Sequence, residues 1–108
     1  MIRNVLVDTQ SGTASPTTTT LNSINLKEAT AFGMFTQVTV SAVTGASYKL
    51  QYSVDDVTYF DSGVTNNVTA TAKFFHEKVD PAFNYVRVVC TVATGSFAYI
   101  IQTMVKGM

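Results

Sequence analysis

Hydrophobic and polar residues alternate with a period of two through most of the chain, and this pattern predicts β-strands. The clearest case is residues 47–54 (SYKLQYSV), where large apolar or aromatic residues alternate with serine, lysine and glutamine. Because side chains two apart share a face of a strand, this segment has one apolar face and one wet face. Residues 32–40 alternate in the same way, with these on one face: Phe32, Met34, Thr36, Val38 and Val40.

Residues 83–106 (FNYVRVVCTV, ATGS, FAYIIQTMVK) form two further alternating arms around a Thr-Gly-Ser turn. The first arm has a nearly all-apolar side, made of Val86, Val88, Cys90 and Val92. Gly95 in the turn is free to take a positive φ, as a tight hairpin requires. We therefore expect this segment to form the longest hairpin of the chain, at the centre of a β-sandwich.

Turn signals separate the remaining alternating segments at intervals of about ten residues, which is typical of a sandwich or small barrel. No segment shows an extended period of 3.6, so little helix is expected. The sequence predicts one all-β domain, a single antiparallel β-sandwich of Ig-like or jelly-roll type with about seven or eight strands. The expected reversals are Thr44-Gly45, Asp55-Asp56, one framed by Ser62-Gly63 and Asn66-Asn67, and Asp80-Pro81.

The N-terminal region departs from this pattern. Residues 8–20 (DTQSGTASPTTTT) contain Gly12, Pro16 and a run of threonines, with no apolar residue larger than alanine. Such a composition is typical of a loop or tether. We expect residues 1–20 to form an extended N-terminal arm that packs outside the compact body, and residues 21–108 to form the sandwich. The alternative is a first strand followed by a long surface loop, although loops that long are uncommon without a role.

Composition narrows the function classes. The 108 residues suffice for one domain. Only 13% of them are charged and the formal net charge is zero, with the basic residues scattered singly. Nucleic acid and anionic membranes attract clusters of Lys and Arg, so neither is expected as a partner. Near-neutral proteins tend to associate, so this surface is either simply tolerated or covered by neighbouring subunits.

The single cysteine, Cys90, rules out an intramolecular disulfide, and with it a disulfide-stapled secreted module. The apolar run at the start, MIRNVLVD, is short and is interrupted by Asp8, so no signal peptide is expected. No stretch approaches the roughly 18 apolar residues of a membrane span. We expect a protein made in the cytoplasm of its host.

Candidate catalytic and metal-binding residues are few. The one histidine, His76, has no recognisable nucleophile and orienting acid around it, so we expect no enzymatic activity. One His and one Cys cannot complete a tetrahedral zinc site, and no cofactor or metal site is expected. Asp55, Asp56 and Asp61 form the only acidic cluster, where calcium is conceivable. Aspartate is also a preferred turn residue, which is the favoured interpretation, and calcium binding stays open.

Aromatic residues are the remaining candidates for a binding site, because flat rings can stack on sugars. Tryptophan is absent, and most of the Tyr and Phe residues recur at core spacing, so core packing is the favoured role. The candidates for glycan or surface contact are Tyr52, Tyr59 and Phe60.

Residues 48–61 (YKLQYSVDDVTYFD) resemble a hairpin that recurs in small β-sandwich domains. There a strand ends in Tyr-Ser-x-Asp-Gly and is followed by two or three residues, an aromatic residue and Asp. The hairpin occurs in carbohydrate-binding and discoidin-like sandwiches and in virion proteins of tailed phages. Here Asp56 or Val57 stands in place of the usual Gly, and Tyr59 or Phe60 in place of the usual Trp.

The chain as a whole is short, rich in threonine and low in charge, with a Thr/Ser/Pro-rich segment near its start. In this it resembles structural proteins of tailed bacteriophages, among them capsid decoration (cement) proteins. The resemblance implies a non-enzymatic virion protein whose partners are its own copies and a major capsid or other virion protein. Many modest contacts would together stabilise the shell. Two alternatives stay open: a small carbohydrate-binding module, and a tail-tube or head-closure subunit that assembles into rings.

Overall fold

The computed structural model describes residues 4–107, which form nine β-strands and no helix. Two of the nine are only three and two residues long, which accounts for the excess over the expected seven or eight. The described residues contain no helix long and apolar enough to span a membrane. The strands are β1 (Asn4–Ala14), β2 (Thr18–Thr20), β3 (Ile24–Asn25), β4 (Ala31–Thr44), β5 (Ala46–Ser53), β6 (Phe60–Val68), β7 (Ala72–Val79), β8 (Tyr85–Thr91) and β9 (Thr94–Lys106).

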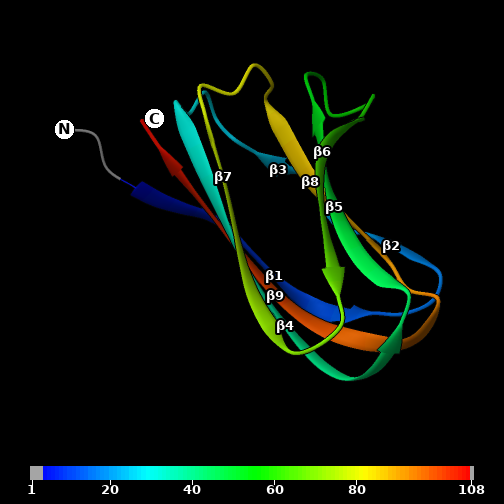
Figure 1. Cartoon of the computed structure of the whole chain (residues 1–108). Helices are drawn as coiled ribbons and strands as arrows, with labels where there is room; N and C mark the ends of the chain where they lie inside the picture. The colour runs from blue at the N-terminus through cyan, green and yellow to red at the C-terminus, as the bar shows by residue number, and fades with distance from the viewer. Residues whose placement is uncertain (1–3, 108) are drawn as a thin grey trace.

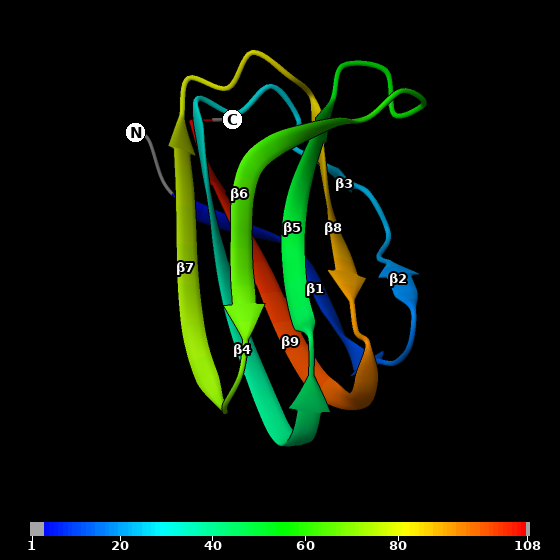
Figure 2. The same cartoon turned by 45° about the vertical axis from the view of Figure 1, so that its right-hand side comes forward.

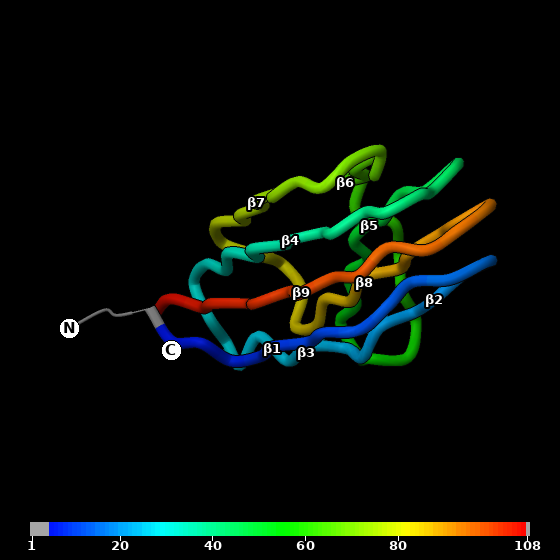
Figure 3. Tube along the Cα trace, turned by 90° about the horizontal axis from the view of Figure 1, so that it is seen from below, coloured from blue at the N-terminus to red at the C-terminus, as the bar shows by residue number. Residues whose placement is uncertain are grey.

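The strands form two antiparallel sheets, which confirms the predicted all-β sandwich (Figures 1 and 2). One sheet has the order β1-β9-β4-β7, and the other has the order β2-β8-β5-β6, with β3 also paired to β8. In Figure 3 the first sheet can be followed from β7 to β1, and the second sheet lies beside it, from β6 to β2.

The pairing has a simple logic. β1 pairs with β9, β2 and β3 with β8, β4 with β7, and β5 with β6, so the chain folds back on itself as one long hairpin. This hairpin is rolled up so that β9 also pairs with β4 and β8 also pairs with β5. Because β2 and β3 both pair with β8, they count as one interrupted strand, and the result is a rolled eight-stranded hairpin in two sheets, which is a jelly roll. Of the two expected sandwich types, Ig-like and jelly roll, the strand order therefore matches the jelly roll.

The expected hairpin over residues 83–106 was wrong in its pairing. β8 and β9 follow one another, but they lie in different sheets, and Thr94-Gly95 is a corner between the sheets. Thr44-Gly45 makes the same kind of corner between β4 and β5, beside the first, because Thr44 is paired with Thr94. Both glycines have positive φ, 60° and 87°. The two arms are nevertheless central, because each lies between two neighbours in its own sheet.

The expected N-terminal arm also differs from the structure, as far as residues 4–20 are concerned. Residues 4–14 form β1, which pairs along β9 as far as Ala14 opposite Phe97, and residues 18–20 pair with β8. Ala14 is fully buried. Edge pairing is made by backbone hydrogen bonds and suits threonine well, so it needs no large apolar side chains. Residues 1–3 of the expected arm lie outside the described residues.

The reversal expected between Ser62-Gly63 and Asn66-Asn67 is also misplaced. Ser62-Gly63 and Asn66-Asn67 both lie within β6, and the chain reverses between Val68 and Ala72. Gly63, at φ 88°, lies in a bulge of β6, where the register shifts between Lys49 and Gln51 of β5. The strand expected near residues 21–27 is reduced to β3. The hairpin across Asp55-Asp56 is confirmed, since β5 and β6 pair.

The core lies between the sheets and consists of the residues that the alternation placed inward. The buried members include Phe32, Met34, Val38, Leu50, Val86, Val88, Cys90 and Val92. At one end, Tyr52 stacks on Phe83 at 3.8 Å between ring centroids, and Phe32 meets both rings edge-on. Such aromatic contacts add about 0.5–1.5 kcal/mol each beyond the area they bury.

Candidate functional site

The outer face of the β1-β9-β4-β7 sheet, which is exposed to solvent, carries large apolar side chains. Alternation along each strand turns them away from the core. We call this set the apolar face: Leu6, Phe35, Phe75, Ile100 and Met104. Apart from Met104, which is partly buried, their exposed fractions lie between 47% and 55%. Contiguous exposed apolar side chains on a single protein commonly mark an interaction site.

The strand register brings these side chains together. Phe35 of β4 is paired with Phe75 of β7, and their ring centroids are 4.7 Å apart. One step along the strands, Met104 of β9 is paired with Leu6 on one side and with Gly33 on the other. The apolar face is therefore continuous across all four strands of the sheet.

A shallow groove of about 460 Å³ lies in this face, and Gly33 is one of its lining residues. A Cβ at position 33 would lie 3.1 Å from Cε1 of Phe75, so the glycine leaves room for that ring. Leu6, Phe35, Phe75 and Met104 line the groove together with the charged residues Glu77 and Lys106. A largely apolar groove that also includes charged side chains has the composition of a protein-binding surface.

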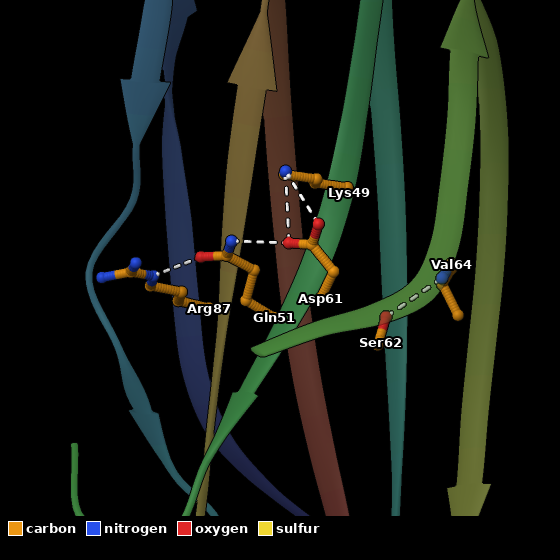
Figure 4. A network of polar contacts seen from close by, with 6 residues as sticks. All are labelled: Lys49, Gln51, Asp61, Ser62, Val64 and Arg87. Atoms are coloured by element: carbon orange, nitrogen blue, oxygen red, sulfur yellow. Dashed lines mark hydrogen bonds and ion pairs between the residues drawn. The ribbon is translucent and has the colours of Figure 1, made fainter. Parts of the chain in front are cut away.

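The outer face of the second sheet is polar. Asp61 of β6 forms an ion pair with Lys49 at 3.2 Å and accepts a hydrogen bond of 2.7 Å from Gln51 (Figure 4). Arg87 of β8 donates from Nε to Gln51 at 2.9 Å, and its guanidinium lies 3.9 Å above the ring of Tyr59. We call these five residues the polar face. The hydrogen bonds from Gln51 and Lys49 lower the pKa of Asp61 below its usual value. The polar groups of this face thus contact one another.

The three predicted contact residues do not form one flat exposed platform. Tyr52 packs inward on Phe83, and its hydroxyl is 3.0 Å from Nε2 of His76. Tyr59 lies beneath Arg87 on the polar face, and its hydroxyl donates to Asp56. Phe60 is paired with Tyr52 across the strands and is 67% exposed. Any glycan contact by these residues stays a prediction.

The acidic cluster is engaged in its own turns. The carboxylate of Asp55 accepts hydrogen bonds from the backbone N–H groups of Val57 and Thr58, at 2.9 and 3.0 Å, and these lower its pKa. Asp61 contacts Lys49 and Gln51 instead. Within residues 4–107 no group of three or more His, Cys, Asp or Glu side chains could hold a metal ion. These contacts favour the turn interpretation of the aspartates.

The two reactive side chains are both shielded. Burial raises the pKa of the Cys90 thiol to about 11, which keeps it protonated and unreactive at neutral pH. Burial also lowers the pKa of His76, and the nearby charge of Lys78 lowers it further. His76 packs edge-on to Phe32 at 5.9 Å, so its surroundings are those of a packed residue.

The apolar face was not predicted from the sequence. A signal was available, because Phe35 and Phe75 have the outward phase in strands whose inward phase already carries large apolar residues, such as Met34 and Phe74. What was missing was the pairing that joins them, since they are far apart in the chain.

No family model matches the chain, and no curated protein matches it either. Solved structures do share its fold over nearly its whole length. PirA is 13% identical, with 92% of this chain and 93% of PirA covered, at a TM-score of 0.60. The SPBc2 prophage-derived protein YomS is 8% identical, with 95% and 98% covered, at a TM-score of 0.55.

A carbohydrate-binding module of lichenase 5A from Cellvibrio mixtus, solved in complex with cellotriose, is 13% identical. The match covers 96% of this chain and 91% of the module, at a TM-score of 0.50. At these identities the likeness is one of fold. The chain is therefore similar in fold both to a prophage protein and to a sugar-binding module.

Proposed function

We propose that this protein is a non-enzymatic structural protein of a tailed-phage virion, and specifically a capsid decoration (cement) protein that stabilises the shell. The apolar face is the observation that carries the proposal, because it gives the domain a continuous surface for a protein partner. The jelly roll is a common fold of viral capsid domains, and the fold likeness to a prophage protein is consistent with a phage origin.

The size of the apolar face favours binding through many copies. Its four most exposed side chains are each about half exposed, so docking would remove on the order of 400 Å² of apolar surface from water. At about 25 cal/mol per Å² this contributes roughly 10 kcal/mol, while association costs about 4–15 kcal/mol. One domain alone would therefore bind weakly. Copies linked to one another on a repetitive shell gain from multivalency.

The structure changes which part of the chain we assign to docking. Residues 4–20 supply β1 and β2 to the two sheets, so their removal would take an edge strand from each. An arm laid across neighbouring subunits is therefore not part of the proposal for these residues. Docking is assigned to the apolar face.

The alternative of a sugar-binding module receives less support from the side chains. Stacking on a sugar needs two or three rings on one wet face, and here Tyr52 packs inward while Tyr59 lies under Arg87. Phe60 is the one strongly exposed ring of the three predicted contacts.

Electron microscopy of virions labelled with gold-tagged antibody tests the proposed location. The virions would come from the phage whose genome encodes the chain, and antibody to an unrelated protein would serve as the control. Label spread over the icosahedral shell is expected. Label confined to the tail or to the head–tail junction would favour the tail-tube or head-closure alternative. Virions without label would overturn the proposal.

A further inference from the structure

The outermost strands of the two sheets differ in how they are protected. β1 has a register shift between Leu6 and Asp8, and β6 has the bulge at Gly63. β2 and β3 are very short. Such interruptions prevent an edge from pairing with another strand. β7 has none of them: it pairs with β4 through eight consecutive residue pairs, from Ala72 opposite Val38 to Val79 opposite Ala31.

The other side of β7 is a free sheet edge, since β4 is its one neighbour in the sheet order. A regular edge strand presents unpaired backbone N–H and C=O groups that can add a further strand. Neither proline nor glycine interrupts β7 (AKFFHEKV). Of the edges that the structure describes, this one is the most open to pairing.

The side chains of β7 are complementary to themselves. Lys73, Phe75 and Glu77 share the outer face, with the aromatic residue midway between the opposite charges. If two copies of β7 pair antiparallel about Phe75, position 77 of each copy lies opposite position 73 of the other. Each Glu77 then faces Lys73 of the second copy, and the two Phe75 rings are adjacent. Opposite charges and aromatic pairs are favourable across strands.

Neither charge is engaged elsewhere in the described part of the chain. The ion pair found within residues 4–107 joins Lys49 to Asp61, on the other sheet. Lys73 and Glu77 are both exposed. On the opposite side of the strand, the same register places Phe74 against His76 of the second copy, both of which are half-buried. The register about Phe75 thus leaves no like charges facing one another.

We infer that the protein forms a two-fold homodimer in which β7 pairs antiparallel with β7 of a second copy, centred on Phe75. The two four-stranded sheets become one eight-stranded sheet. A two-fold interface uses the same surface on both subunits, as this pairing does.

The dimer has a consequence for the apolar face. A two-fold axis perpendicular to the joined sheet keeps both apolar faces on the same side. The rings then form a row of four across the joined sheet, in the order Phe35 and Phe75 of one copy, then Phe75 and Phe35 of the other. One dimer would present twice the apolar docking area of a monomer, and two linked contacts bind far more tightly than one. The dimer rests on the geometry of β7 and does not require the virion role.

Charge reversal with sedimentation equilibrium tests the pairing. Lys73→Glu or Glu77→Lys alone makes both cross-strand pairs repulsive, and we expect dimerisation to weaken by about tenfold. The double variant Lys73→Glu/Glu77→Lys restores attraction, and its dissociation constant should return to within about threefold of wild type. Lys78→Glu is the matched control, because it changes the net charge equally but faces Ala72 of the second copy. Far-UV circular dichroism checks that each variant is folded.

A wild-type protein that is monomeric up to about millimolar concentration would overturn the inference, because specific but weak complexes are populated by then. A dimer that all three charge variants and the control weaken equally would also overturn it.

A disulfide test locates the two-fold axis. Cβ atoms of directly opposed residues in an antiparallel pair lie about 4.5–5.5 Å apart, close to the range that a disulfide spans. Because Cys90 is buried, Phe75→Cys introduces the one exposed thiol of the described chain. We expect rapid disulfide dimer formation with Phe75→Cys under mild oxidation, and slow formation with Gln37→Cys on neighbouring β4. Equal rates for the two variants would contradict a pairing centred on Phe75.

These tests separate the inference from the proposed function. If the protein is a dimer in solution but the virions carry no antibody label, the virion role alone is refuted. Label on the shell together with a monomer in solution refutes the dimer alone.

Discussion

The two outer faces of this sandwich obey the same alternation but have opposite chemistry. On the β2-β8-β5-β6 sheet the outward side chains are Lys49, Gln51, Asp61 and Arg87, which bond to one another. On the β1-β9-β4-β7 sheet the outward positions include leucine, isoleucine and phenylalanine side chains that are about half exposed, beside the charged Lys73 and Glu77. One face is complete within the chain, and the other lacks a cover. We propose that this difference marks the face that serves a partner.

The largest effect is expected on docking. Phe75→Ser removes the most exposed side chain of the apolar face and one ring of the Phe35 pair, so binding to shells stripped of the protein should fall at least about hundredfold in a multivalent assay. The fold should stay intact, because the ring is surface-exposed. Co-sedimentation with stripped shells measures the loss.

Phe60→Ser is the matched control, since Phe60 is also an exposed phenylalanine but belongs to the second sheet. Binding should be unchanged in this variant. Equal losses for Phe60→Ser and Phe75→Ser would remove the distinction between the faces.

A smaller effect, on stability, is expected from the polar face. Arg87→Ala removes the hydrogen bond to Gln51 and the contact with Tyr59, which should lower the free energy of unfolding by about 1–2 kcal/mol. Urea denaturation measures the loss, and shell binding should be retained. A variant that keeps its stability but loses shell binding would reverse the roles assigned to the two faces.

The smallest effect concerns pH. The folded protein lowers the pKa of His76 below 6.5, so the folded state holds fewer protons there than the unfolded chain does. The stability from this shift is present above about pH 6.5 and is lost as the pH falls through the folded pKa. His76→Gln should therefore flatten the fall in unfolding free energy on acidification over this range. Urea denaturation at a series of pH values measures it, and an identical pH profile in both proteins would contradict the shift.

The period-two pattern predicted the sandwich and the inward residues of β4, β5 and β8 correctly. A strand with one buried face has apolar residues at every second position, so burial can be recognised from the sequence. It could not say which strands pair. Thr-Gly suits a hairpin tip and a corner between sheets equally well, so β8 and β9 were wrongly joined. Only contacts across the whole chain decide between them.

Residues 4–14 illustrate a second limit. Threonine, serine and glycine signal a loop when apolar residues are taken as the mark of a strand, yet β1 is held by backbone hydrogen bonds to β9. The apolar face escaped prediction for a related reason. Phe35 and Phe75 are ordinary residues in their own segments and become a site through the pairing of β4 with β7.

Hydroxyl-radical footprinting of the protein bound to stripped shells tests the central claim most directly, because both outer faces carry side chains that radicals oxidise. The account predicts that Phe35, Phe75 and Met104 become protected on binding, while Tyr59 and Phe60 keep the oxidation rates of the free protein. Protection of Tyr59, with Phe35 and Phe75 unchanged, would contradict it and place the partner on the polar face.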